Sequence, residues 1–196
     1  MENNSQPQVE KYSYIDKPKK QTAAKILNAV LIAIIILLVI TLIIFTTTLT
    51  TITVDGKSMF PTLVDGDRLV LIKHGYTLKQ GDIIVFTREG HNNVKRILGL
   101  EGDVIQFDME NMTWVVNGTP YEEEYIEGGY SDNYFSMSNR DVLNDIFSEE
   151  GLVVPQGKMF VLGDNRNIQG GGISMDSHTY GVWDTSTIMG KVIKIY

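Results

Sequence analysis

The sequence of 196 residues predicts a mainly β protein: a single N-terminal transmembrane helix followed by a coiled antiparallel β-sheet or barrel-like domain. Two observations predict this. Residues 26–45 contain only Asn28 and Thr41 as polar side chains, and a helix of about 20 residues spans about 30 Å, the thickness of the hydrocarbon core of a bilayer. After residue 50, short apolar runs alternate with turn-forming residues. This pattern is typical of antiparallel strands rather than of alternating strands and helices.

The chain is expected to comprise a tail, an anchor and an outer domain. Residues 1–25 are polar and rich in lysine, so we predict a disordered basic tail, and we place a transmembrane anchor at residues 26–48. A cleaved signal peptide is the alternative, but its apolar core is usually about 7–15 residues long and precedes small residues. Lysines before the span, and few cations immediately after it, indicate a cytoplasmic N-terminus. We therefore expect a single-pass plasma-membrane protein with residues 50–196 outside the cytoplasm.

Composition excludes several classes of function. A formal net charge of -7 and a pI near 4.9 argue against a nucleic-acid partner, because no basic face is available to neutralise phosphates. The absence of cysteine excludes thiol nucleophiles, thiolate metal sites and disulfides. The three histidines, His74, His91 and His178, have no metal-ligand spacing. The sequence therefore predicts neither a metal site nor a cofactor.

Short apolar runs predict the strands of the outer domain. They are expected at residues 68–73, 82–87, 94–99, 103–108, 113–116, 119–121, 158–162 and 191–195. Asn117 and Gly118 give the strongest hairpin signal, because both residues accept the positive φ of a type I′ turn. The acid-rich residues 122–151 are expected to form a solvated excursion with a short helix at residues 142–147.

A predicted turn at residues 55–63 presents a serine. Gly56 allows a positive φ, and Pro61 fixes its own φ and pushes Phe60 out of the α region. Ser58 is thus presented on bent backbone, as a nucleophile requires, although such a serine is more often part of an ordinary ST-turn. Neither the phosphate-binding loop nor the serine-hydrolase elbow fits, because the glycines that those motifs require are absent.

A serine nucleophile needs a proton acceptor, and Lys95 is the candidate. Strand alternation at residues 94–98 puts Lys95 and Ile97 on one face and Arg96 on the other, so one of the two cations points inward. The alternative is a cation that keeps an edge strand soluble. Burial lowers the pKa of lysine from about 10.4, and a lowering by about 2 units costs roughly 2.7 kcal/mol. A Ser–Lys dyad is therefore chemically feasible where water is excluded.

Four ordered segments of the chain resemble the type I signal peptidases. The matching segments are residues 58–63, 81–86, 95–103, and 163–166 with 174–177. The resemblance extends from about residue 54 to residue 181. Lysine rather than histidine at position 95 resembles the bacterial members, and a single preceding anchor with a short outer domain is most similar to the Gram-positive ones. It implies a membrane-anchored serine endopeptidase that removes N-terminal signal peptides from exported preproteins. It also implies the lipid bilayer as a partner, and neither a cofactor nor a metal.

The resemblance assigns roles to the matched positions. Ser58 would be the nucleophile, with its backbone N–H as one oxyanion donor, and Lys95 would be the general base. Ser174 would hydrogen-bond the lysine and hold it in place. Asp164 would pair with Arg96.

Further roles follow from the same resemblance. Asp176 would support the strand that carries the base. Val54, Met59 and Val94 would line shallow pockets for the small residues before the scissile bond. A substrate would bind in extended form and add a strand to a sheet edge.

Three positions depart from the family pattern. Gly56 has no hydroxyl, whereas members with serine there use it as a second oxyanion donor. Residues 167–173 separate two segments that usually lie two residues apart, and their three glycines predict a mobile loop beside the site. His178 replaces the usual arginine.

Two alternatives have different functions. One is a non-catalytic, membrane-anchored module that binds exported proteins or pilus subunits. Gly56 and the glycine-rich insertion are consistent with it, whereas the presence of both Ser58 and Lys95 argues against it. The other is a self-cleaving repressor of a DNA-damage response with the same dyad. The transmembrane span and the lack of a basic DNA-binding segment argue against the repressor.

Overall fold

The computed structural model describes residues 18–131, 134–136, 138–167 and 175–196. The contacts within the chain divide it into two compact units, and the boundary between them in the sequence lies between Phe45 and Thr46. The first unit contains most of one long helix, and the second contains all the described strands. The two units are described separately below.

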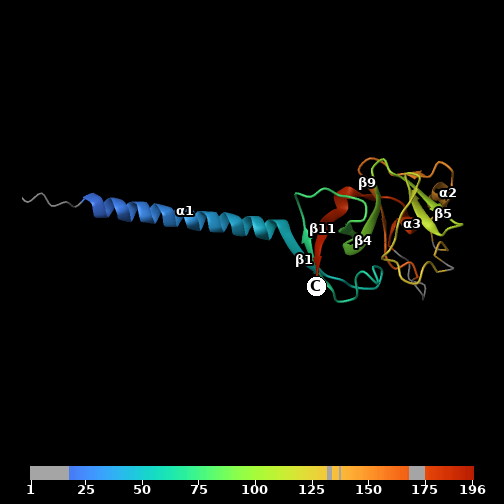
Figure 1. Ribbon diagram of the computed structural model, residues 1–196, viewed down its shortest axis with the longest axis horizontal. Coiled ribbons are helices and arrows are strands. Elements are labelled where there is room, and N and C mark those ends of the chain that lie inside the picture. Colours follow the sequence, from blue (N-terminus) through green and yellow to red (C-terminus); the bar gives the residue numbers. More distant parts are fainter. Residues whose placement is uncertain (1–17, 132–133, 137, 168–174) are drawn as a thin grey trace, which may run out of the picture. The chain divides into compact units, whose positions relative to one another are not determined.

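The first unit is dominated by α1, which runs from Pro18 to Thr48 (Figure 1). The prediction of a disordered tail up to residue 25 is therefore wrong for residues 18–25. Proline favours the first turn of a helix, and the lysine, glutamine and alanine residues that follow it are good helix formers. Thr22–Thr48 is long and apolar enough to cross a membrane, and its large apolar side chains are not covered by other parts of the chain. These properties are consistent with a membrane anchor.

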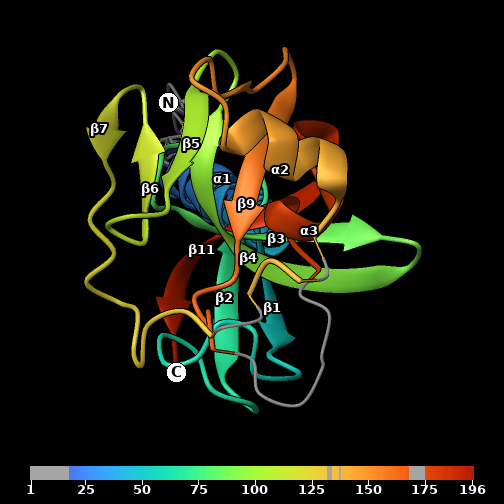
Figure 2. The same cartoon turned by 90° about the vertical axis from the view of Figure 1, so that its right-hand side faces the viewer.

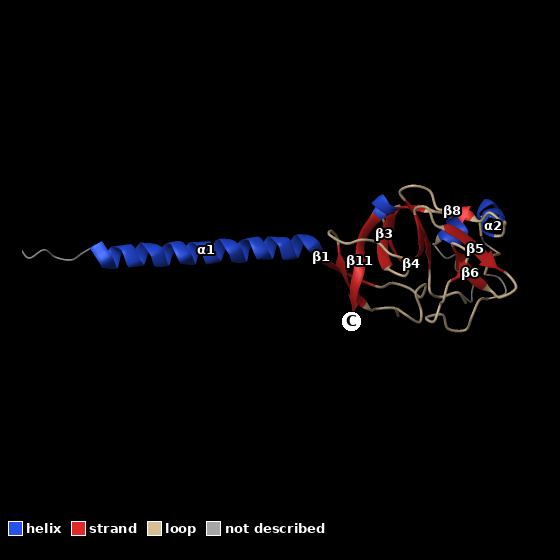
Figure 3. Cartoon of the chain, turned by 45° about the horizontal axis from the view of Figure 1, so that its top comes forward, coloured by secondary structure: helices blue, strands red, loops and turns tan. Residues whose placement is uncertain are grey.

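The second unit contains a seven-stranded sheet in the order β1-β2-β11-β3-β4-β9-β10. All neighbouring strands pair antiparallel. These strands are β1 (Leu49–Thr53), β2 (Arg68–Ile72), β3 (Ile83–Arg88), β4 (His91–Leu100), β9 (Lys158–Leu162), β10 (Trp183–Asp184) and β11 (Ile188–Ile195). The predicted mainly β, antiparallel fold is confirmed, and Figure 3 shows how strands dominate this unit.

A smaller, four-stranded sheet lies in the same unit, with the order β7-β6-β5-β8. Its strands are β5 (Val104–Asp108), β6 (Thr113–Val116), β7 (Thr119–Pro120) and β8 (Leu152–Val153). The predicted hairpin between β6 and β7 is confirmed: Asn117 has a φ of 53° and Gly118 a φ of 74°. Both residues thus adopt the positive φ that a type I′ turn needs.

Strand β4 begins three residues earlier than predicted. Asn92 and Asn93 pair with β3, and the resulting hairpin extends from the rest of the unit (Figure 2). The pairing of β4 with β9 is irregular between Ile97 and Gly99. Because of this bulge, Ile97 and Leu98 are both buried, so the simple alternation expected for the strand does not extend past Ile97.

Within the described part of the acid-rich residues 122–151 only Val142 and Ile146 are buried, but the segment is anchored more firmly than the predicted solvated excursion. Its helix α2 (Arg140–Ile146) begins two residues before the predicted helix, and it buries Val142 and Ile146. Tyr130 and Phe135 pack against the same apolar cluster, which lies between α2 and the smaller sheet. The apolar and aromatic residues distributed among the carboxylates therefore anchor this segment.

Two short helices complete the second unit. They are α3 (Ser177–Tyr180) and the 3₁₀ helix η1 (Thr185–Thr187). Helix α3 contacts both α2 and β9. It therefore links the anchored acidic segment to the seven-stranded sheet.

Candidate active site

Ser58 and Lys95 are neighbours in the structure although they are 37 residues apart in the sequence. The distance from Lys95 Nζ to Ser58 Oγ is 2.6 Å. The lysine Nζ also donates to the carbonyl of Val94 at 3.0 Å. The serine lies in the turn after β1, and the lysine lies on β4. The chain thus brings a hydroxyl and an amine together within hydrogen-bonding distance.

The turn that carries Ser58 is held by buried side chains on its C-terminal side. Met59 and Leu63 belong to one apolar cluster, and the Leu63 N–H donates to the Met59 carbonyl at 2.9 Å. Gly56 has a φ of 97°, and its N–H donates to Asp65 Oδ1 at 2.8 Å. An L-amino acid with a side chain would be strained at this φ, so the conformation of the turn requires glycine at position 56.

Lys95 is buried, with 2% of its surface exposed. Burial lowers its pKa below the usual 10.5, whereas the carboxylates of Asp176 and Asp164 act in the opposite direction. Each carboxylate has another partner: Asp164 pairs with Arg96, and Asp176 accepts a hydrogen bond from the Gly163 N–H. These partners reduce the ability of the carboxylates to keep the proton on the lysine.

Asp164 and Arg96 form the ion pair that the sequence predicted. Arg96 Nε lies 2.9 Å from Asp164 Oδ1, and Arg96 Nη2 lies 2.6 Å from Asp164 Oδ2. The guanidinium also donates to the carbonyl of Gly81 and lies 4.0 Å from the centre of the Tyr125 ring. Since Asp164 is fully buried, this bidentate pair fixes the end of β9 to β4.

Asp176 lies at the start of α3 and acts on the neighbouring strand. Its Oδ2 accepts a hydrogen bond from the N–H of Gly163 at 3.1 Å, and its Oδ1 contacts His178 Nδ1. The imidazole stacks on the ring of Tyr134, with 4.3 Å between the ring centres. Asp176 therefore contacts the end of β9, which pairs with β4, and its link to the base strand is indirect.

The predicted pocket residues lie together. Val54 and Met59 are buried in one apolar cluster, and Val94 packs against that cluster. Ser174 and most of the glycine-rich insertion, residues 168–173, lie outside the described residues. The predicted contact of Ser174 with the lysine and the predicted loop therefore remain predictions.

Sequence reasoning missed Asn165 and Arg166. The N–H of Asn165 donates to the Ser58 carbonyl at 3.0 Å, and its Nδ2 donates to the Lys57 carbonyl at 2.9 Å. Arg166 is buried, and its Nη2 lies 2.5 Å from Glu123 Oε1. Both residues belong to the matched segment 163–166, but the resemblance assigned a role there only to Asp164.

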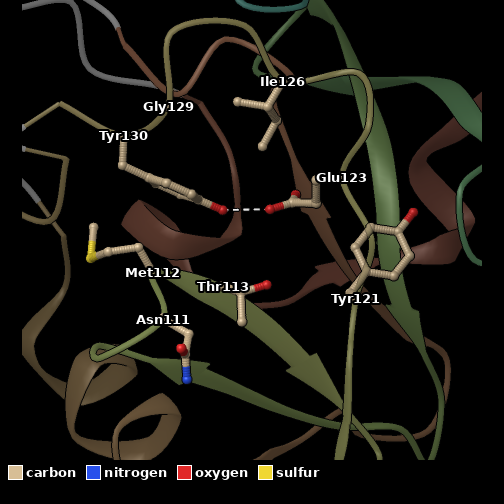
Figure 4. A pocket seen from close by; sticks show the side chains of 8 residues that line it. All are labelled: Asn111, Met112, Thr113, Tyr121, Glu123, Ile126, Gly129 and Tyr130. Atoms are coloured by element: carbon tan, nitrogen blue, oxygen red, sulfur yellow. Dashed lines mark hydrogen bonds between the residues drawn. The ribbon is translucent and has the colours of Figure 1, made fainter.

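A cavity of about 390 Å³ lies beside the acidic segment, bordered by Met112, Tyr121, Glu123 and Tyr130 among others. Figure 4 shows the Tyr130 hydroxyl and the Glu123 carboxylate facing each other, at 2.5 Å. Among the described residues that line this cavity there is neither a serine nor a lysine. We therefore assign the candidate chemistry to the serine–lysine pair and not to this cavity.

A serine hydroxyl beside a buried lysine amine is an arrangement that peptidases of the serine class can use. A family model, "Signal peptidase, peptidase S26", matches residues 26–196. The chain belongs to this family, whose members are serine peptidases that act on preproteins carrying signal peptides. The resemblance noted in the sequence is thus confirmed.

Individual relatives support this assignment. Signal peptidase IB of Staphylococcus aureus is 34% identical over 155 residues, which are 74% of this chain and 75% of the relative. Signal peptidase I P of Bacillus subtilis subsp. natto is 36% identical over 143 residues, or 70% of this chain and 71% of the relative. A signal peptidase I structure from Enterococcus faecalis V583 is 26% identical and covers 61% of this chain and 98% of that one. Its TM-score of 0.38 is too low to support an argument about the fold.

Proposed function

We propose that this chain is a membrane-anchored endopeptidase that removes signal peptides by means of a Ser58–Lys95 dyad. The observation that carries the proposal is the distance of 2.6 Å between Ser58 Oγ and the Nζ of a buried lysine. An ordinary surface lysine is protonated near neutral pH and cannot accept a proton. Burial lowers the pKa of Lys95, so the neutral amine that a general base must provide becomes accessible.

The proposed reaction has two halves. Neutral Lys95 takes the hydroxyl proton as Ser58 Oγ attacks the scissile carbonyl, and the tetrahedral oxyanion accepts a hydrogen bond from the Ser58 N–H. The protonated lysine then gives its proton to the leaving amine of the mature protein. In the second half, the lysine takes a proton from water as the water oxygen attacks the carbonyl carbon of the serine ester. The protonated lysine then returns this proton to Ser58 Oγ as the ester C–O bond breaks, and the signal peptide leaves with a new C-terminal carboxyl group. Ser174 would hold the lysine amine in place.

The substrate would bind along β4. In the described part of the chain, β9 pairs with β4 only between Arg96 and Leu100. The preceding residues of β4 pair with β3 on their other side, so one side of the backbone before Arg96 can accept an extended peptide as an added strand. Val54, Met59 and Val94 would then form shallow pockets for the small residues before the scissile bond.

Cleavage of a preprotein by the purified chain in detergent tests this function. We expect one cut, after a small-x-small sequence, which mass spectrometry of the two products would locate. A chelator should not change the rate, because the proposed chemistry uses no metal. A module that only binds exported proteins would retain the preprotein uncut, and that result would exclude the proposed activity.

The proposed orientation leads to a separate prediction. Lysines precede the apolar span and few cations immediately follow it, so residues 50–196 should lie outside the cytoplasm. Protease added to intact spheroplasts should therefore digest the second unit and spare an N-terminal epitope tag. Lysed spheroplasts provide the control in which both parts are digested. Protection of the second unit in intact spheroplasts would contradict both the orientation and the proposed role in export.

A further inference from the structure

Asn165 holds the backbone on both sides of the Ser58 α-carbon. Its side-chain Nδ2 donates to the Lys57 carbonyl at 2.9 Å, and its own N–H donates to the Ser58 carbonyl at 3.0 Å. The two accepting carbonyls belong to consecutive peptide groups. One residue thus restrains the orientation of both peptide planes around the proposed nucleophile.

The first of these planes contains the proposed oxyanion donor. A peptide group is planar and trans, so its C=O and N–H point in opposite directions. When Asn165 holds the Lys57 carbonyl, it therefore also sets the direction of the Ser58 N–H, which belongs to the same peptide group. Within the part of the chain that the structure describes, no group accepts a hydrogen bond from that N–H. It is free to donate to a substrate.

The neighbouring residues make this peptide group sensitive to rotation. Gly56 lies one residue before this peptide group, and a side chain at Gly56 would meet no atom within 4 Å, so packing at that position does not help to hold the turn. Gly56 also offers no hydroxyl that could serve as a second oxyanion donor. Correct orientation of the Ser58 N–H is therefore more important here than in a site with two donors.

Asn165 can act as a restraint because both of its neighbours are fixed. Asp164 is fully buried and pairs with Arg96 on β4. Arg166 is 1% exposed, its Nε donates to the Gly163 carbonyl at 2.6 Å, and its other nitrogens bind Glu123. Thus Asp164 contacts β4, Asn165 contacts the serine turn, and Arg166 contacts the acidic segment.

We propose that Asn165 is a positioning residue that aims the Ser58 N–H at the oxyanion of the transition state. This inference rests on the proposed function, because it assumes that Ser58 is the nucleophile. In the described part of the chain, Asn165 hydrogen-bonds backbone groups, and none of these bonds is to Ser58 Oγ or Lys95 Nζ. Its effect is confined to the direction of one backbone donor, which acts mainly in the transition state.

The test compares Asn165→Ala, Asn165→Asp and Asn165→Gln in the full-length protein in detergent. Alanine and aspartate lose the amide donor, and we expect kcat to fall about 10- to 100-fold with KM changed by no more than about twofold, since one oxyanion donor is worth about 10²–10³ in kcat. Glutamine keeps the amide on a longer side chain. Because the contact with the Lys57 carbonyl is solvent-exposed, Asn165→Gln should retain more activity than the other two variants.

A pair of inhibitors separates positioning from a general loss of structure. A peptide boronic acid with the signal-peptide sequence forms a tetrahedral adduct with a serine and places an oxygen in the oxyanion position. The same peptide with a methylene in place of the scissile carbonyl has no such oxygen. Asn165→Ala should weaken boronate binding about 10- to 100-fold and change binding of the second peptide by less than about twofold.

Asn117→Asp is the matched control, because Asn117 also donates from its Nδ2, to Asp103, but lies in the turn between β6 and β7 of the smaller sheet. Its kcat should match that of the unchanged protein. A kcat within twofold of the unchanged protein in all three Asn165 variants would overturn the inference while leaving the dyad intact. Equal weakening of both inhibitors would overturn it as well. Undiminished cleavage by Ser58→Ala would instead overturn the proposed function.

Discussion

Lys95→Met should abolish cleavage and leave the protein folded. Methionine has a similar length and no amine, so no group remains at 2.6 Å from Ser58 Oγ to accept the hydroxyl proton. Loss of one member of a nucleophile–base unit lowers kcat by about 10⁴- to 10⁶-fold. Initial rates of preprotein cleavage in detergent measure this loss, and the melting temperature of the same sample shows whether the variant is folded.

The cleavage rate of the unchanged protein should rise with pH. Burial lowers the pKa of Lys95 below 10.5, and only the neutral amine accepts a proton from the serine. The rate should therefore increase as pH passes through the lowered pKa and then level off. The pH dependence of kcat/KM reports this value for the free enzyme.

The stability of Lys95→Met should depend on pH in a related way. The folded-state pKa of the lysine lies below its unfolded value of 10.5, so the unfolded state binds more protons between the two values. Below the folded-state pKa, the buried lysine is charged and the protein bears the whole cost of burying that charge. This cost decreases, and the free energy of unfolding rises, as pH increases toward 10.5. The methionine variant has no such dependence. Its melting temperature should equal or exceed that of the unchanged protein near neutral pH, by a margin that shrinks in alkaline buffer.

Three further variants serve as controls for the dyad. Lys95→Arg should be inactive, because a guanidinium does not deprotonate in this range. Ser58→Ala should be equally inactive, and the double variant Ser58→Ala with Lys95→Met no worse, because the two residues act as one unit. Substantial cleavage by Lys95→Arg would contradict the dyad and would make His178 the next candidate base.

Local patterns in the sequence were sufficient to predict most of the fold. The asparagine–glycine turn and the apolar runs each have their own backbone preference, so the eight predicted strands lie close to their predicted positions. Strands β1, β8 and β10 were not predicted. The start of β4 could not be predicted, because Asn92 and Asn93 are poor strand formers that pair with β3 only through the hairpin. The start of α1 was missed for a different reason: residues 18–25 are helical although they lack an apolar face.

Only those residues of the candidate site that lie in a recognisable sequence motif could be assigned a role from the sequence. Ser58 and Lys95 are brought together by a register that no local pattern encodes, and four ordered segments were needed to connect them. Asn165 forms hydrogen bonds to two backbone carbonyls, one from its side chain and one from its own N–H. The types of residue in the sequence do not reveal such bonds. Glu123 was assigned to solvent because carboxylates are seldom buried. Its burial depends on Arg166, 43 residues further along the chain.

Asp164→Asn should cause the largest loss of stability among the site variants. Asparagine has nearly the same shape but no charge, so the Arg96 guanidinium, with 14% of its side chain exposed, keeps its charge and loses its ionic partner. Removing one member of a buried ion pair costs about 3–5 kcal/mol. For a domain of about 150 residues this lowers the melting temperature by about 6–20 °C. Scanning calorimetry in detergent measures the loss.

The same variant should also change catalysis in a defined direction. The Asp164 carboxylate raises the pKa of Lys95 against the larger effect of burial. Removing that charge should lower the pKa of the lysine further, so the rise of the rate with pH should move to lower pH. This shift is measured below the melting temperature of the variant, where the protein remains folded.

Two comparisons show whether the loss comes from an unpaired buried charge. Arg96→Met combined with Asp164→Leu removes both charges, and it should be less destabilising than the sum of the two single changes. Asp184→Asn breaks a more exposed ion pair, with Lys158 at 2.8 Å, and should cost no more than about 1 kcal/mol. If Asp164→Asn were as mild as Asp184→Asn, the pair between β9 and β4 would not be a structural support of the site. In that case Arg96 would have to be held by its contacts with the Gly81 carbonyl and the Tyr125 ring alone.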